Sequence, residues 1–298
     1  MRALGSYAVL DWLRGDPLVH GFKRVRNLFV ERTFRHLRPP GLERFIADHE
    51  QLASGSVAVT IAYNAPWVVE LLIRMARLKL SSPLLVFDNS RSAKAREEIA
   101  RLCRERKVPY FPLPYNPERH PCRSHGVAMN WVWYNVIRKW KTRVIGFLDH
   151  DLVPLQKVDF EALVRTQPVY GVLNQSAWGW NLWAGFSVFQ VAAIDRWNPD
   201  FNNDVPRGLD TGGQNYTRVY RRLPFDQTVF ADWRYEWIRD PAGSTVVPVN
   251  LVDSWLHVGG AGFGDERQSQ GSPDFYRRLV RYVEEGGALS DLVCAAPR

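Results

Sequence analysis

Two aspartates separated by one residue, Asp149 and Asp151, directly follow the apolar run Val144–Leu148. A continuous apolar run of this length is typical of a buried strand, and open α/β sheets bind ligands at the carboxyl ends of their strands. Carboxylate oxygens are the ligands that Mg²⁺ and Mn²⁺ prefer, often together with substrate phosphates. The pair therefore predicts a site where Mn²⁺ or Mg²⁺ holds a diphosphate. An aspartate-rich turn is the alternative, because Asp is also favoured in turns.

Strands and helices are predicted to alternate in the part of the chain that leads to this pair. The pattern predicts strands over residues 57–62, 83–87, 109–113 and 144–148, with helices over 67–80, 92–107 and 125–140 between them. Such alternation is typical of βαβ units, so we expect an α/β fold with a mostly parallel central sheet flanked by helices. Beyond residue 160 we expect strands over 169–173 and 186–189 and helices over 210–222 and 273–285.

The chain of 298 residues divides into three expected parts: a basic helical N-terminal arm over 1–50, a catalytic α/β domain over 51–270, and a C-terminal helix and tail over 271–298. The formal net charge of +8 calls for an anionic partner. Much of the excess lies in the arm, where apolar residues and cations are interleaved. Such an arm either docks on an anionic membrane surface or packs on the domain with its basic face in solvent. No nucleic-acid-binding motif accompanies the charge, so nucleic acid is not expected as a partner.

The three cysteines form no disulfide framework, which indicates a reducing compartment. The N-terminus lacks the compact apolar core of a signal peptide, and the uncharged stretch over 168–194 is too polar for a spanning helix. We therefore expect a cytoplasmic protein, with peripheral attachment at the inner face of a membrane as the option that the basic arm leaves open.

Polar residues also follow the first two predicted strands. Thr60 to Asn64 close the first strand, and Asp88 closes the second. If the connections are right-handed, these residues and the aspartate pair share one crevice at the carboxyl edge of the sheet. Asp88 could accept hydrogen bonds from a base or a ribose hydroxyl; a strand-ending turn and helix cap is the alternative.

Taken together, these segments resemble nucleotide-sugar-dependent glycosyltransferases of the GT-A (Rossmann-like) type, in particular their family-two-like branch. The resemblance runs from residue 56 to about 155, through the segments 60–64, 86–90, 125–130 and 147–151. It implies a nucleotide-sugar site formed by Thr60, Ala62, Tyr63, Asn64, Asp88, Asn130 and Asp149. It also implies a metal site formed by Asp149 and Asp151 and completed by His257.

Further along the chain the resemblance depends on single residues. Gly185 resembles the segment that lines the acceptor side, and Asp210 stands where an acceptor-activating carboxylate is expected. Leu209 precedes Asp210 where many members have Glu, which leaves inversion or retention of configuration open. An inverting displacement needs such a base, whereas in a retaining reaction Asp210 would steady an intermediate. A helix N-cap is the alternative for Asp210 and a packed histidine for His257, while the glycine-rich run 259–264 is either a lid or a surface loop.

Trp180 and Trp183, with Gly185, are expected to bind the acceptor, because indole rings can stack on a sugar; core packing is the alternative for these tryptophans. The segment 120–125 contains metal-ligand residue types, but no second cluster at zinc-finger spacing, so it is expected to be structural. Its basic members, with Arg119, could instead meet the diphosphate.

The sequence thus predicts a metal-dependent glycosyltransferase that moves a sugar from a nucleotide-diphosphate sugar to a saccharide, lipid-linked or protein acceptor. A nucleotidyltransferase on a similar sheet is one alternative, although a glycine-rich basic loop after the first strand is missing. A basic docking protein that keeps the fold without catalysis is the other.

Overall fold

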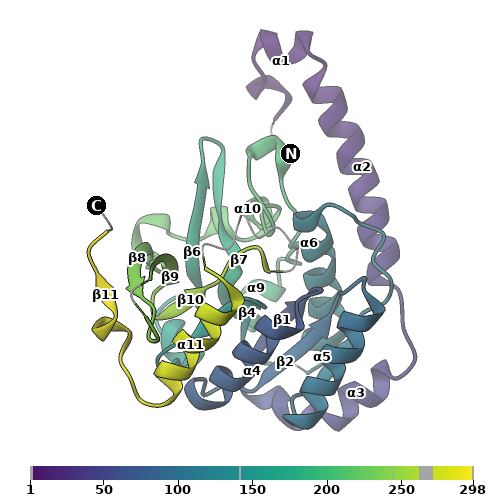
Figure 1. Cartoon of the computed structure of the whole chain (residues 1–298). Coiled ribbons are helices and arrows are strands. Elements are labelled where there is room, and N and C mark those ends of the chain that lie inside the picture. Colours follow the sequence, from purple (N-terminus) through teal and green to yellow (C-terminus); the bar gives the residue numbers. More distant parts are fainter. Residues whose placement is uncertain (1–2, 141, 244, 262–270, 297–298) are drawn as a thin grey trace.

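The computed structural model describes residues 3–140, 142–243, 245–261 and 271–296. A central sheet has six strands: β1 Ser56–Ala62, β2 Leu84–Asp88, β3 Tyr110–Pro112, β4 Val144–Asp149, β6 Val169–Ser176 and β7 Gly179–Gln190. They lie in the order β3-β2-β1-β4-β7-β6. The pairs β3–β2, β2–β1 and β1–β4 are parallel, while β7 is antiparallel to both β4 and β6. The predicted α/β class with a mostly parallel central sheet is therefore confirmed (Figure 1).

Helices connect the parallel strands and cover both faces of the sheet. They are α4 Pro66–Lys79, α5 Ala93–Glu105 and α6 Pro121–Val132, the last of which continues through a π-helical turn at Trp133–Ile137 into α7 Arg138–Trp140. Alternate side chains of β1 enter different cores, as the twofold period of a strand requires. Val57, Val59 and Ile61 pack with α6 and its continuation. Ala58 and Ala62 pack with α4 and α5 on the opposite face.

The strand order fixes where a ligand can bind. From β1 the chain proceeds to β2 and β3 on one side and then returns to place β4 on the other side. The strand order therefore switches direction between β1 and β4, and crevices in open α/β sheets form at such points. Ile61 of β1 is paired with Asp149 of β4, so the carboxyl ends of both strands meet there.

A second, five-stranded sheet was not predicted from the sequence. Its strands are β5 Leu152–Pro154, β8 Trp233–Arg239, β9 Val246–Val252, β10 Trp255–His257 and β11 Val293–Cys294, in the order β11-β8-β9-β10-β5. All four pairings are antiparallel. Helix α11 Pro273–Glu284 and one face of α4 pack against this sheet, so it joins the central domain through a shared core.

Two predicted segments differ in the structure. Residues 174–185, which lie between the strands expected over 169–173 and 186–189, instead form the end of β6, the turn and the start of β7, so that the two strands make one long hairpin. The helix expected over 210–222 is reduced to α10 Asn215–Arg218 and a 3₁₀ turn at Tyr220–Arg222. Two other short helices, α8 Phe160–Leu163 and α9 Val191–Asp195, flank the hairpin in the sequence.

The N-terminal segment forms α1 Val9–Leu13, α2 Asp16–Arg35 and α3 Leu42–Asp48. Figure 1 shows α1 and the first half of α2 projecting away from the sheet. The remainder belongs to the main core, since Phe34, Leu42 and Phe45 are buried with the aromatic side chains beneath the central sheet. No helix in the described ranges is both long and apolar enough to cross a membrane.

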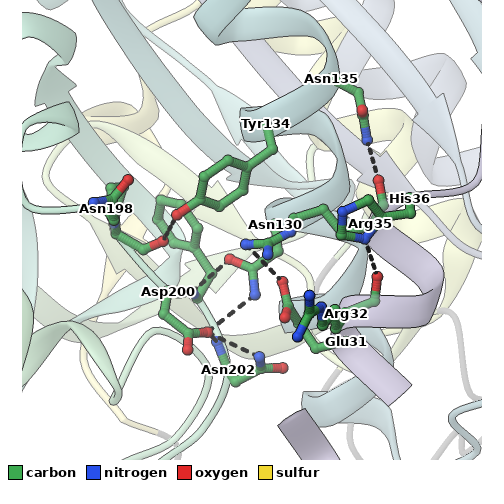
Figure 2. A network of polar contacts seen from close by, with 12 residues as sticks. Glu31, Arg32, Arg35, His36, Asn130, Tyr134, Asn135, Asn198, Asp200 and Asn202 are labelled. Atoms are coloured by element: carbon green, nitrogen blue, oxygen red, sulfur yellow. Dashed lines mark hydrogen bonds and ion pairs between the residues drawn. The ribbon is translucent and has the colours of Figure 1, made fainter. Parts of the chain in front are cut away.

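The end of α2 lies beside a polar network around Asp200 and is held by contacts of Arg35 with Tyr134 and Asn135 (Figure 2). The Asp200 carboxylate accepts hydrogen bonds from Asn130 Nδ2 at 3.0 Å and Asn202 Nδ2 at 2.8 Å. Arg35 of α2 stacks over the ring of Tyr134 at 4.5 Å and pairs with the buried Glu31 at 3.4 Å. Burial, and then the neighbouring Asp200, raise the pKa of Glu31. These contacts fix the direction in which α2 leaves the body.

Candidate active site

Two carboxylates and an imidazole converge at the switch point between β1 and β4. One ligand atom from each of Asp149, Asp151 and His257 lies within 4.8 Å of the others. Asp149 ends β4, whereas Asp151 immediately precedes β5. His257 ends β10, which pairs with β5 so that His257 lies opposite Leu152. The second sheet thereby brings a residue from late in the sequence to the aspartate pair.

The three side chains have the electrostatics of an incomplete cation site. His257 Nε2 lies 3.7 Å from Asp151 Oδ1, and the second ring nitrogen of His257 is buried without a hydrogen-bond partner among the described residues. Burial, and then the like charge of Asp151, raise the pKa of Asp149 to about 7. Two neighbouring carboxylates that resist ionisation together are stabilised by a cation between them. The donor set of two carboxylates and one imidazole fits Mn²⁺, and Mg²⁺ with fewer protein ligands.

A cavity of about 310 Å³ surrounds the cluster. Seven residues predicted from the sequence line it: Tyr63, Asp149, Asp151, Trp183, Gly185, Asp210 and His257. Its wall also includes residues from the start of α6 and the loop before it: Arg119, Pro121, Cys122, Ser124 and His125. Helix N-termini favour anions, and the N-cap residue His120 makes no side-chain capping bond among the described residues, so this wall combines the guanidinium of Arg119 with a helix N-terminus suited to a phosphate.

His125 of this wall lies beside Asp149. Its Nδ1 lies 3.4 Å from Asp149 Oδ1. Burial lowers the pKa of His125 to about 4, so the ring is neutral near pH 7 and the contact is not an ion pair. The sequence carried a signal for this wall in the cluster of ligand-type residues over 120–125, which was expected to be structural. The segment lines the cavity because α6 begins beside the end of β4, and this tertiary contact cannot be deduced from the segment alone.

Asp210 is exposed and lies in a loop with a defined conformation. Asp204 and Leu209 exchange backbone hydrogen bonds at its base, and Thr211 Oγ1 donates to the carbonyl of Cys122 at 2.9 Å. Burial, and then the adjacent Asp210, raise the pKa of the Cys122 thiol to about 12, so Cys122 stays protonated. Gln214, not Asp210, occupies the N-cap position of α10. Asp210 is thus a carboxylate at the cavity and not a helix cap, and the Thr211 hydroxyl lies 3.5 Å from its Oδ1.

Five residues predicted for the nucleotide site do not line the cavity. Thr60 and Ala62 are fully buried in β1. Asn64 has a positive φ of 51° and accepts hydrogen bonds from the backbone of Arg91 and Ser92. These bonds tie the loop after β1 to the loop after β2.

Asp88 is also fully buried, where it accepts hydrogen bonds from the Tyr110 hydroxyl at 2.9 Å and from the Ser90 N–H at 2.7 Å. The neighbouring residue Asn89 lines the cavity instead. Asn130 is fully buried and belongs to the network that holds the loop at Asp200 and Phe201. These residues shape the loops around the cavity from behind.

The two tryptophans predicted for the acceptor side are placed differently. Trp180 is buried among Tyr220, Phe225 and Phe230 in the main core. Trp183 lines the cavity, with its ring centroid 4.9 Å from that of His257. Of the glycine run after His257, residues 262–264 lie outside the described part of the chain.

Gly185 sits where no larger residue fits. Phe186 pairs with Leu148 across β7 and β4, which places Gly185 beside Asp149. A Cβ at Gly185 would lie 2.1 Å from the Trp183 ring and 2.5 Å from Asp149 Oδ2. The absence of a side chain lets the indole cover the carboxylate.

No protein-family model matches this chain, and no curated protein matches it either. Among solved structures, glucosyl-3-phosphoglycerate synthase from Mycobacterium tuberculosis, in complex with Mg²⁺ and uridine diphosphate, is similar over 65% of this chain and 74% of its own, with 10% identity and a TM-score of 0.40. The bifunctional glycosyltransferase WbbM is similar over 49% of this chain and 33% of its own, with 14% identity and a TM-score of 0.34. TarS from S. aureus is similar over 50% of this chain and 30% of its own, with 14% identity and a TM-score of 0.32.

This chain therefore spans about a third of the WbbM and TarS chains. At these TM-scores the likeness is loose and carries no weight for the chemistry of the site. What the site can do is decided by its own residues.

Asp151→Asn should weaken Mn²⁺ binding by about 100-fold or more, because loss of a direct ligand costs at least as much as loss of a residue that only orients one. Isothermal titration calorimetry of the folded variant measures this. The exposed Asp48→Asn serves as the matched control and should leave the affinity unchanged. Equal Mn²⁺ affinities for wild type and Asp151→Asn would show that the cluster does not bind the ion.

Gly185→Ala should lower the free energy of unfolding by about 1–3 kcal/mol, because overpacking forces Trp183 or Asp149 to move. Since Asp149 is one of the converging ligands, Mn²⁺ affinity should fall as well. Urea unfolding and calorimetry measure the two effects. Gly55→Ala is the control, since a Cβ there meets open space. A stable Gly185→Ala variant with intact metal affinity would contradict the packing argument.

Proposed function

We propose that this protein is a metal-dependent glycosyltransferase that moves a sugar from a nucleotide-diphosphate sugar to a saccharide, lipid-linked or protein acceptor. The observation that carries the proposal is the convergence of Asp149, Asp151 and His257 at the switch point of a parallel sheet. The motif resemblance over residues 56–155 gives the same class of reaction. The exposed carboxylate of Asp210 in the same cavity adds a group able to act on an acceptor.

The proposed donor site places the diphosphate between the metal ligands and the start of α6. Asp149, Asp151 and His257 would hold Mn²⁺ or Mg²⁺, and a divalent cation bound there would supply Lewis-acid stabilisation of the leaving diphosphate. Arg119 and residues at the start of α6 line the same cavity. Their positive charge favours a phosphate that gains negative charge during bond cleavage.

The proposed nucleoside subsite lies where the loops after β1 and β2 meet. Tyr63 and Asn89 present side chains to the cavity there. Thr60, Ala62, Asn64, Asp88 and Asn130 support this wall through the buried contacts described above. Both carboxylate oxygens of Asp88 accept hydrogen bonds, one from Ser90 and one from Tyr110. Its proposed role is therefore to set the shape of the loop after β2.

On the proposed acceptor side, Asp210 takes the proton from the attacking hydroxyl. A base in this position gives a single inverting displacement, and positioned bases contribute about 10²–10⁴-fold to a rate. Burial keeps the neighbouring Cys122 a neutral thiol by raising its pKa, and the Asp210 carboxylate beside it is the proposed base. Trp183 offers an indole edge to a sugar, beside Gly185.

The proposed compartment is the cytoplasm. Cys103, Cys122 and Cys294 are all free, which supports a reducing environment.

A panel of nucleoside diphosphates and their sugar conjugates tests the proposed reaction class. With Mn²⁺ present, one base series should raise the melting temperature by several degrees, because a ligand that binds only the folded state stabilises it. With chelator, and in Asp151→Asn with Mn²⁺, the same ligands should have no effect. Equal stabilisation with chelator would contradict the metal clamp, and no response to any nucleotide would contradict the proposed donor.

Asp210→Asn should lower turnover of the donor found in that panel by about 10²–10⁴-fold while donor binding is retained, because the substitution removes the base but none of the metal ligands. Release of nucleoside diphosphate in the presence of acceptor is the readout. The exposed Asp226→Asn is the matched control and should behave as wild type. Wild-type turnover by Asp210→Asn would remove this residue from the reaction.

A further inference from the structure

A second groove, of about 650 Å³, lies between the end of α2, the end of the α6–α7 helix and the segment from residue 198 to α10. Figure 2 shows much of its lining. Leu28, Tyr134 and Pro199 are its apolar or aromatic members, and the other described residues that line it are polar or charged. None of the described residues that line it also lines the cavity around Asp149.

Five arginines from three segments of the chain meet in this groove. They are Arg32 and Arg35 of α2, Arg38 just after it, Arg138 of α7 and Arg218 of α10. Two carboxylates, Glu31 and Asp200, line the groove as well, so three positive charges are in excess among its lining residues. Asp195 lies outside the lining and pairs with Arg138 at 2.7 Å, which lowers the excess to two. Such a concentration of positive charge attracts an anion.

Two of these guanidiniums have no carboxylate partner. Arg32 and Arg38 are exposed, and no ion pair joins either of them to a carboxylate among the described residues. Arg38 Nη1 donates hydrogen bonds to the backbone carbonyls of Arg35 at 2.9 Å and of Leu37 at 3.2 Å. Arg32 and the other N–H groups of Arg38 can therefore donate to a ligand without breaking an ion pair.

Two further guanidiniums are oriented by one aromatic ring. Arg35 lies over the ring of Tyr134 at 4.5 Å, and Arg138 lies over the same ring at 4.9 Å. Contact with an aromatic face orients a guanidinium but leaves its positive charge in place. A planar guanidinium presents its donors as a rigid fork that matches the oxygens of a phosphate or a carboxylate. Tyr134 thus holds two such forks in the groove.

The acidic side chains of the groove are much less accessible than the basic ones. The side chains of Glu31 and Asp200 are 8% and 7% exposed, whereas those of Arg35, Arg138 and Arg218 are 29%, 33% and 37% exposed. Burial, and then the charge of Asp200, raise the pKa of Glu31, so Glu31 loses its negative charge at a higher pH than an ordinary glutamate. A ligand in the groove therefore meets mainly the arginines.

We propose that this groove is a second ligand site, which binds a sugar phosphate with its phosphate group among the guanidiniums of Arg32, Arg35 and Arg38. A phosphate monoester carries a charge of about −1.5 to −2 near pH 7, which matches the excess of two positive charges better than a carboxylate does. A groove of about 650 Å³ holds more than a phosphate and is as large as ordinary small-molecule sites. Its polar lining suits the hydroxyls of a sugar.

The groove is separate from the proposed donor site. Cys122 at the start of α6 lines the metal cavity, and Tyr134 near the end of the same continuous helix lines the groove. Twelve residues of helix span about 18 Å, so one small phosphate compound does not occupy both places. Binding in the groove requires none of the residues Asp149, Asp151 and His257, and hence no metal ion.

Titration calorimetry of the full chain with chelator present tests this site. The probes are glucose 6-phosphate, inorganic phosphate, glucuronate and glucose. Wild type should bind glucose 6-phosphate more tightly than inorganic phosphate, because the sugar adds contacts with the polar lining. It should bind glucuronate at least about tenfold more weakly than glucose 6-phosphate, because a carboxylate has less charge and fewer oxygens, and it should not bind glucose. Asp151→Asn should bind glucose 6-phosphate as wild type does.

Arg32→Gln/Arg38→Gln should weaken the binding of glucose 6-phosphate by about 100-fold, since loss of the hydrogen bonds of one guanidinium to a charged group costs about tenfold or more. Arg32→Glu alone should weaken it by at least about tenfold, which provides a second test if the double variant does not fold. The matched control is Arg44→Gln/Arg101→Gln, which removes two exposed arginines outside the groove and should bind as wild type. Circular dichroism checks that each variant is folded.

Several results would overturn this second site. The site is absent if wild type does not bind glucose 6-phosphate, or if Arg32→Gln/Arg38→Gln and Arg32→Glu both bind it with wild-type affinity. Glucuronate binding as tight as that of glucose 6-phosphate would overturn the choice of a phosphate, and inorganic phosphate binding as tightly would overturn the sugar. These measurements use neither metal nor nucleotide, so this site and the proposed sugar transfer can fail independently.

Discussion

The repulsion between Asp149 and Asp151 is the constraint around which the site is built. Two carboxylates placed one residue apart at the end of a buried strand are unfavourable as a pair of ions, and burial increases the cost. The fold holds the two carboxylates in place from three sides. Strand β4 fixes Asp149, and the pairing of β5 with β10 fixes Asp151 relative to His257. Trp183 covers the remaining side, beside Gly185. A bound cation is the counter-charge that such an arrangement favours.

The second sheet is therefore part of the site and not an appendage. Its strands β5 and β10 are short, and they bring residues more than a hundred positions apart into register. The core shared by α4, α11 and this sheet makes the register a property of the whole domain. A change in that core would displace His257 and so act on the proposed metal site without replacing any of its three side chains.

Residues whose position follows from local pattern were placed well from the sequence. Asp149 and Asp151 follow an unmistakable buried strand, and Tyr63 ends another, so their meeting follows from the rules of parallel sheets. Asp88 and Asn130 were harder, because a polar side chain near a strand end either faces the ligand or satisfies a buried backbone, and only tertiary contacts decide. Here Asp88 accepts a hydrogen bond from Tyr110, and Asn130 donates one to Asp200. Trp180 packs in the core against three aromatic rings from residues 220–230, a segment whose position the sequence did not predict.

The antiparallel sheet escaped prediction for a similar reason. In β8 only Ile238 is buried, and β9 alternates in burial but contains Pro248, a residue that argues against a strand, so neither strand stands out in the sequence. The loop at Asp210 likewise looks helical in sequence, but its two closing hydrogen bonds between Asp204 and Leu209 hold it in a turn. In the sheet, pairing between strands decides the structure, and in the loop, two backbone hydrogen bonds decide it. In both cases these contacts outweigh the local propensity of the sequence.

The exposed apolar side chains of α2 have a consequence for the behaviour of this protein in solution. Leu18, Phe22, Val25 and Phe29 share one side of this helix, and each is at least 68% exposed. The formal net charge of +8 makes whole molecules repel one another, which keeps them dispersed. Salt screens that repulsion as ionic strength rises, whereas the attraction between apolar surfaces persists, so concentrated salt should promote aggregation and dilute buffer should prevent it.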